Sequence, residues 1–189
     1  MLPTVRVFIC LCAVLLSLVA CSSNNVVVHK NENSGLLTWT AERDGFSIEL
    51  IQLLPDFVRA IYAKHGFSDK ELERIAGYCV FGTIIKNTSA FPLSYKVSDW
   101  TYTTNNLTNR VKTKTQWLDE WRKAGITFSW TLLPDSGDFE VGDWQQGFTT
   151  IELARNSKFD LTVEWEINGK RYNNTLDGVI CSPETLQPM

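Results

Sequence analysis

The chain has 189 residues, with 18 basic and 21 acidic side chains and a formal net charge of −3. Because these charges form no run of one sign, the composition argues against nucleic acid as a partner. Hydrophobic residues make up 44% of the chain, which is enough for the core of one domain of this length.

The chain opens with an apolar segment over residues 7–20, preceded by the single charge of Arg6. A helix needs about 20 apolar residues to cross a bilayer, so the shorter segment fits a cleaved signal peptide better. We therefore predict a signal peptide over residues 1–20.

The residues that close this segment, Leu18-Val19-Ala20-Cys21, resemble the lipobox of bacterial lipoproteins. The resemblance implies cleavage after Ala20, a diacylglyceryl group on the Cys21 thiol and an acyl chain such as palmitate on the new amino terminus. Two or more acyl chains hold a protein firmly on a membrane. Members of this class with Ser instead of Asp after the cysteine usually go to the outer membrane. Ser22 therefore implies an outer-membrane location, with the protein facing the periplasm. The alternative is an ordinary signal peptide with a cysteine just after the cut.

Cysteine usage suggests one disulfide. Of five cysteines, Cys10 and Cys12 lie in the signal segment and Cys21 would carry the lipid, which leaves Cys79 and Cys181. An exported protein meets an oxidising compartment, so we predict that these two form a bond. Two free thiols, one of them a metal ligand, are the alternative.

The polar stretch that follows Cys21 is typical of a tether. We expect residues 21–35 to link the anchor to a single globular, β-rich domain over residues 36–189. Val26 to Val28 interrupt the polar stretch and could instead pair as an edge strand.

A helical hairpin is predicted near residues 55–77. Pro55 suits a first helical turn, and Gly66 and Gly77 suit helix ends. Ser68 and Glu71 have the spacing of a capping box. The apolar run over residues 78–87 then predicts a strand buried on both faces.

The second half is mainly β. Apolar or alternating runs predict strands over residues 126–132, 148–153 and 159–167, and Asn168-Gly169 predicts a hairpin turn into residues 170–174. A helical turn or two is expected between Trp117 and Lys123. We predict a mainly β (α+β) fold, an antiparallel, immunoglobulin-like β-sandwich that carries the helical hairpin.

Signals for chemistry are weak. The common hydrolase, metalloprotease, thiol-redox and nucleotide-binding motifs do not occur after residue 21, so we expect no cofactor and no enzymatic activity. His29 and His65 make a poor metal site. Four acidic residues between Asp135 and Asp143 could bind calcium in principle, although their spacing is not that of an EF-hand.

The chain has seven tryptophans. Trp130 and Trp165 lie in apolar runs and are expected in the core. Trp117, Trp121 and Trp144 lie in or near polar stretches, so we predict that they form an exposed binding surface.

We therefore expect a membrane-anchored periplasmic lipoprotein, a non-catalytic binding or assembly module for an envelope protein. The domain is similar to uncharacterised bacterial lipoproteins. The alternatives are a domain that binds envelope polysaccharide through exposed tryptophans, and a protein that delivers a metal such as copper or hides a hydrolase activity.

Overall fold

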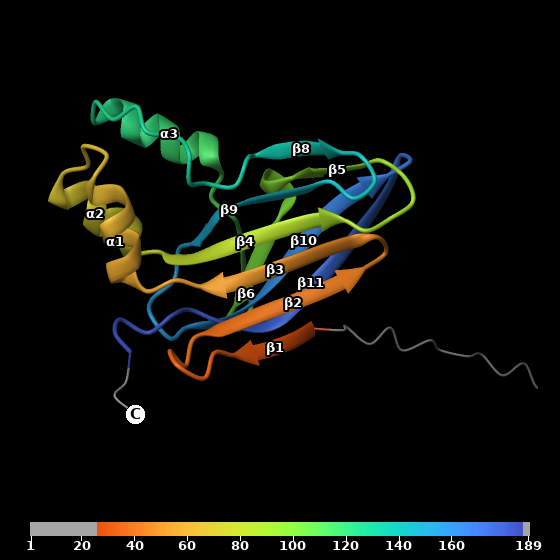
Figure 1. Ribbon diagram of the computed structural model, residues 1–189, viewed down its shortest axis with the longest axis horizontal. Coiled ribbons are helices and arrows are strands. Elements are labelled where there is room, and N and C mark those ends of the chain that lie inside the picture. Colours follow the sequence, from red (N-terminus) through yellow and green to blue (C-terminus); the bar gives the residue numbers. More distant parts are fainter. Residues whose placement is uncertain (1–25, 187–189) are drawn as a thin grey trace, which may run out of the picture.

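Two antiparallel β-sheets pack face to face, and three helices gather at one end of them (Figure 1). The computed structural model describes residues 26–186. The predicted mainly β, antiparallel sandwich is confirmed, as is the helical hairpin near residues 55–77. The predicted signal peptide and the lipidation site Cys21 lie outside the described residues.

The first sheet has five strands, and its inner face forms one side of the main core. Phe46, Ile48 and Leu50 alternate along one strand and are buried, because successive side chains of a strand point to opposite faces. In spatial order the strands are β1 (Val26–Lys30), β2 (Leu37–Arg43), β3 (Phe46–Gln52), β4 (Cys79–Asn87) and β9 (Trp144–Ile151).

The edge strand of this sheet falls in the range predicted to be a tether. β1 pairs with β2 along its whole length, from Val26 opposite Ala41 to Lys30 opposite Leu37. The edge-strand alternative for Val26 to Val28 is therefore the one that the structure shows. The folded domain includes residue 26, and the link to Cys21 is correspondingly shorter than predicted.

The second sheet is built around one long strand, β10. One side of β10 pairs with β11, and its other side pairs first with β6 and then with β5. Positive φ angles at Asn168 (51°) and Gly169 (74°) confirm the turn that the Asn-Gly pair predicts. The elements are β5 (Leu93–Lys96), the 3-10 turn η1 (Val97–Asp99), β6 (Thr101–Thr104), β7 (Leu107–Arg110), β8 (Ser136–Phe139), β10 (Lys158–Ile167) and β11 (Lys170–Ile180).

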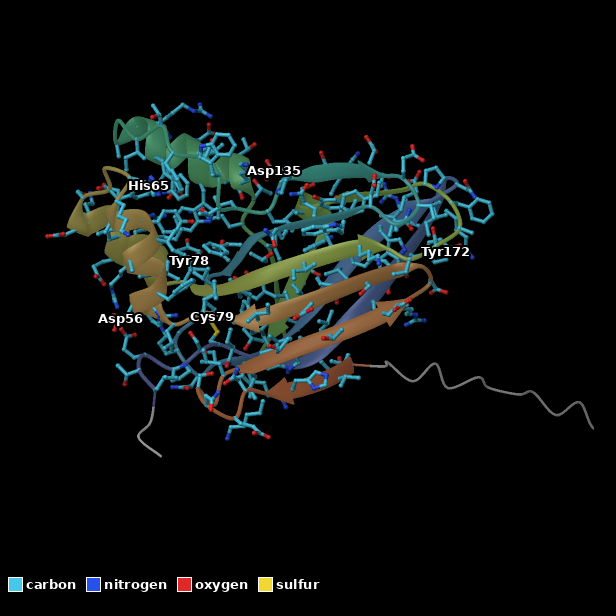
Figure 2. All side chains as sticks on the ribbon, viewed as in Figure 1. Asp56, His65, Tyr78, Cys79, Asp135 and Tyr172 are labelled. Atoms are coloured by element: carbon cyan, nitrogen blue, oxygen red, sulfur yellow. A yellow bond between two sulfur atoms is a disulfide. The ribbon has the colours of Figure 1, made fainter. Side chains whose placement is uncertain are left out.

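A disulfide joins the two sheets at the helical end, as predicted (Figure 2). Cys79 begins β4 and Cys181 follows β11, and their Cα atoms lie 5.2 Å apart. Close by, the buried Gln52 side chain of β3 donates a hydrogen bond of 2.8 Å to the Ile180 carbonyl. Both links hold the same end of the sandwich closed.

The helices form a second, smaller core against the first sheet. α1 (Pro55–Ala63) and α2 (Asp69–Ala76) make the predicted hairpin, and α3 (Lys114–Lys123) packs with them. α3 starts at a complete capping box formed by Thr113 and Gln116. Within residues 26–186, no helix is both long and apolar enough to span a bilayer.

The strand predicted over residues 126–132 is wrong. The chain there is irregular, with one bridge from Leu132 to Phe148. Its apolar pattern has a different cause, because Ile126 and Leu132 are buried in the helical core instead of in a strand ladder.

Candidate binding groove

The structure corrects the predicted binding surface. Trp117 and Trp121 are buried, with exposed fractions of 0% and 2%, so the prediction that they form an exposed surface is wrong. Trp144 is 58% exposed, in agreement with its prediction, and Trp165 is buried, as expected. Trp130, expected in the core, is instead 86% exposed.

Trp117 and Trp121 are buried because they lie, with the partly buried Leu118, on the apolar face that α3 turns toward its neighbours. They lie four residues apart, on one face of the helix. The Trp117 Nε1–H donates a hydrogen bond of 2.9 Å to the Thr150 hydroxyl of β9. The Trp121 ring lies 5.0 Å from the Phe67 ring, between centroids. Both tryptophans therefore attach α3 to the domain.

Trp130 lies on the segment between α3 and β8, which runs beside β9. Phe148 in β9 donates its backbone N–H to the Thr131 carbonyl at 2.7 Å, and Leu133 donates to the Phe148 carbonyl at 3.0 Å. Gly147 permits this close approach, because a Cβ atom there would lie 2.4 Å from the Leu133 Cα. Tyr62 adds a hydrogen bond between its hydroxyl and that of Thr131. The backbone that carries Trp130 is therefore held firmly.

Trp130 borders a groove of about 330 Å³ on the outer face of the first sheet. Ile51, Gly82 and Phe148 lie opposite one another on β3, β4 and β9 and cross its floor. Gly82 lacks a side chain, so the surface is recessed at the middle of this row. Figure 1 shows that the helices lie at one end and leave this face of β2, β3 and β4 uncovered. The lining residues are Ile51, Gly82, Thr83, Ile84, Trp130, Thr131, Gln146, Gly147 and Phe148.

The groove is apolar and electrically neutral. Its polar side chains on the outer face are those of Gln146 and Thr131, and none of the described lining residues is charged. Thr83 follows Gly82 in β4, so its side chain points to the inner face, where its buried hydroxyl bonds to that of Thr149 at 2.8 Å. Such a groove can accept an uncharged group that packs against Trp130 and bonds to the Gln146 amide.

A second cluster, formed by Arg74, Lys112 and Glu120, is charged but internally paired. Arg74 of α2 and Lys112 lie 2.8 and 2.7 Å from the carboxylate of Glu120 in α3. Hydrogen bonds from Arg74 and Lys112 lower the pKa of Glu120 from 4.5 to about 2. The Lys112 ammonium lies 3.6 Å from the centroid of the Trp117 ring. Burial at this position lowers the pKa of Lys112. We interpret this cluster as a structural link between α2 and α3.

The candidate metal ligands lie apart. Within residues 26–186, no three His, Cys, Asp or Glu side chains gather as metal ligands would. His29 is on β1, and His65 stacks on Phe128 with ring centroids 4.0 Å apart. Two of the acidic residues considered for calcium bind backbone N–H groups instead: Asp135 accepts from Thr115 and Asp143 from Glu140.

Comparisons with known proteins add one weak similarity. No protein-family model matches the sequence, and no curated protein is significantly similar to it. Among solved structures, a candidate lipoprotein of Bacillus subtilis, ycdA, is similar, with 11% identity and a TM-score of 0.42. The match covers 74% of this chain and 38% of that protein. This TM-score is too low to assign a function to this chain from that protein.

Proposed function

We propose that this protein is a membrane-anchored, non-catalytic binding module that holds an envelope protein partner through the Trp130 groove. The observation that carries the proposal is the exposed Trp130 ring beside a glycine-floored hollow. A large aromatic side chain normally loses most of its surface to a core or to a partner. The firmly held backbone at Thr131 lowers the entropy lost when a partner covers the ring.

The neutrality of the groove supports binding over catalysis. General acid–base catalysis needs titratable groups at the reacting atoms, and the described groove lining offers amides and hydroxyls. The fitting occupant is an apolar side chain of a partner with a hydrogen-bonding group next to it.

The proposal includes acylation of Cys21 and a place on the outer membrane, facing the periplasm. It is supported by the lipobox-like residues Leu18 to Cys21 and by Ser22. Cys21→Ala should release the protein from membranes. A Cys21→Ala protein that stays fully membrane-bound, or a wild-type protein that fractionates with the inner membrane, would contradict this part.

The partner can be tested by mild cross-linking of envelopes followed by detergent purification of the anchored protein. Trp130→Ala should weaken the binding of a partner by about 2 kcal/mol or more, which is roughly a 30-fold loss of affinity. Leu107→Ala is the matched control, because Leu107 is also highly exposed, at 67%, but lies on β7 of the other sheet. Equal recovery of every partner by the two variants would contradict the proposal.

One observation favours a second candidate, a domain that binds a neutral envelope polysaccharide. A sugar ring can stack its apolar face on an aromatic ring while its hydroxyls bond to an amide, and the groove places the Gln146 amide beside Trp130. A screen of neutral glycans separates the candidates. Binding that Trp130→Ala abolishes would favour the polysaccharide.

A further inference from the structure

We infer that the end of the sandwich opposite the helices rests on the lipid bilayer that carries the anchor, with Phe91, Val141 and Trp144 in the membrane interface. The inference rests on the proposed acylation of Cys21 and goes beyond it, because an anchor alone does not fix how a domain is oriented. We call this region, defined by those three residues and the loops over 88–92 and 140–143, the membrane end.

The first argument is the length of the link and the point where it meets the fold. Four residues separate Cys21 from Val26, so the two Cα atoms lie at most about 17 Å apart. β1 begins away from the helices (Figure 1). Its first residue, Val26, pairs with Ala41, two residues before the end of β2. The nine residues of β4 span about 30 Å. The link is therefore shorter than the sandwich and holds its membrane end near the bilayer.

The second argument is the exposure of apolar side chains at this end. Phe91, Val141 and Trp144 are 54%, 58% and 58% exposed. Trp144 lies opposite Lys86, the second-last residue of β4, so it shares the end of the sheet with the two loops. Aromatic residues are enriched where membranes meet water, because they have both apolar and polar parts.

The buried Asn87 side chain ties the two loops together. Its amide donates hydrogen bonds of 2.8 Å to the Phe91 carbonyl and 3.1 Å to the Glu140 carbonyl. Its backbone N–H donates to the Asp143 carbonyl at 2.9 Å. The three exposed apolar side chains are therefore presented by one interlinked set of loops.

The membrane end carries charges of both signs. This favours contact through insertion of apolar side chains and not through attraction to anionic lipid. Lys86 and Lys170, at strand ends, share this end of the sandwich with Glu140 and Asp143 of the 140–143 loop and with the Arg43–Asp44 pair of the β2–β3 turn. Opposite signs in one region leave little net attraction for a charged surface. Vesicles of a zwitterionic lipid should therefore suffice for contact.

The experiment uses the acylated protein in phosphatidylcholine vesicles, with or without brominated acyl chains, which quench nearby tryptophans. After flotation confirms anchoring, brominated vesicles should quench part of the fluorescence. Trp144→Phe should remove that quenching. Trp130→Phe is the matched control, since it changes the other highly exposed tryptophan, and it should leave quenching unchanged. Phe91→Ser with Val141→Ser should reduce quenching of Trp144 by at least half, and Leu107→Ser should not.

The outcomes separate this inference from the proposed function. Acylated protein that fails to float with vesicles overturns the anchor, and the orientation with it. Protein that floats but is not quenched, or is quenched equally in the Trp144→Phe variant, overturns the orientation and leaves the anchor intact. Quenching that Trp130→Phe abolishes would place the groove face on the membrane instead.

Discussion

Replacing Trp117 by Ala should destabilise the domain severely, because this residue joins three parts of the fold. Its ring is fully buried, touches the Tyr78 ring at 4.8 Å between centroids, and carries the hydrogen bond to Thr150. Truncating a buried Trp costs about 3 to 5 kcal/mol. We expect a value near 4 kcal/mol, since the Thr150 hydroxyl and the Lys112 ammonium also lose a partner.

Thermal denaturation of the purified protein measures this effect. In a domain of this size 1 kcal/mol lowers Tm by about 2 to 4 °C, so Trp117→Ala should lower it by about 8 to 16 °C. Trp117→Phe keeps most of the packing and should lose about 1 to 2 kcal/mol. Trp130→Ala should stay within about 0.5 kcal/mol of wild type. A loss below 1 kcal/mol for Trp117→Ala would refute the assignment of this residue to the core.

Three further predictions concern links within the fold. Cys79→Ala with Cys181→Ala should cost about 4 to 5 kcal/mol in urea denaturation, because the bond closes a loop of 102 residues; an unchanged midpoint would contradict this. Glu120 has a lowered pKa, so its stabilisation is full above pH 4.5 and is lost as the pH falls toward 2. This loss of stability is about 1 kcal/mol after allowing for solvent screening. It should be absent from the Tm–pH profile of Glu120→Gln, and a Glu120→Gln profile identical to that of wild type would argue against the ion pair. Asn87→Ala should speed hydrogen exchange in the loops over residues 88–92 and 140–143, and unchanged protection there would show that other contacts hold them.

Features encoded by neighbouring residues could be predicted from the sequence. The hairpin at Asn168-Gly169 follows from a two-residue turn signal, and the helical hairpin follows from Pro55, Ser68 and Gly77. The disulfide was predicted by setting aside the cysteines of the predicted signal peptide and the predicted lipidation site, which leaves Cys79 and Cys181.

Burial of the tryptophans could not be predicted in the same way, because it depends on elements far apart in the chain. Nearly every residue of α3 other than Trp117 and Trp121 is polar, so a local average hides the narrow stripe that packs against α1 and α2. Trp130 lies between buried residues of an apolar run, yet the contact of Thr131 with β9 leaves its ring in solvent. Gly82 and Gly147 were the available signals, since each marks a strand position without a side chain.

Photo-cross-linking in living cells, with an aromatic photoreactive residue that keeps a ring at position 130, tests the Trp130 groove most directly. Gly82→Val is the deciding variant, because a Cβ atom there meets Ile51 only at an ordinary 3.7 Å, so the side chain fits and occupies the floor of the groove. Our account predicts one discrete adduct from position 130, no adduct from position 107, and loss of the first adduct on Gly82→Val with Tm unchanged or raised. An adduct that persists undiminished in the Gly82→Val protein, or that forms at position 107 and not at 130, would contradict it.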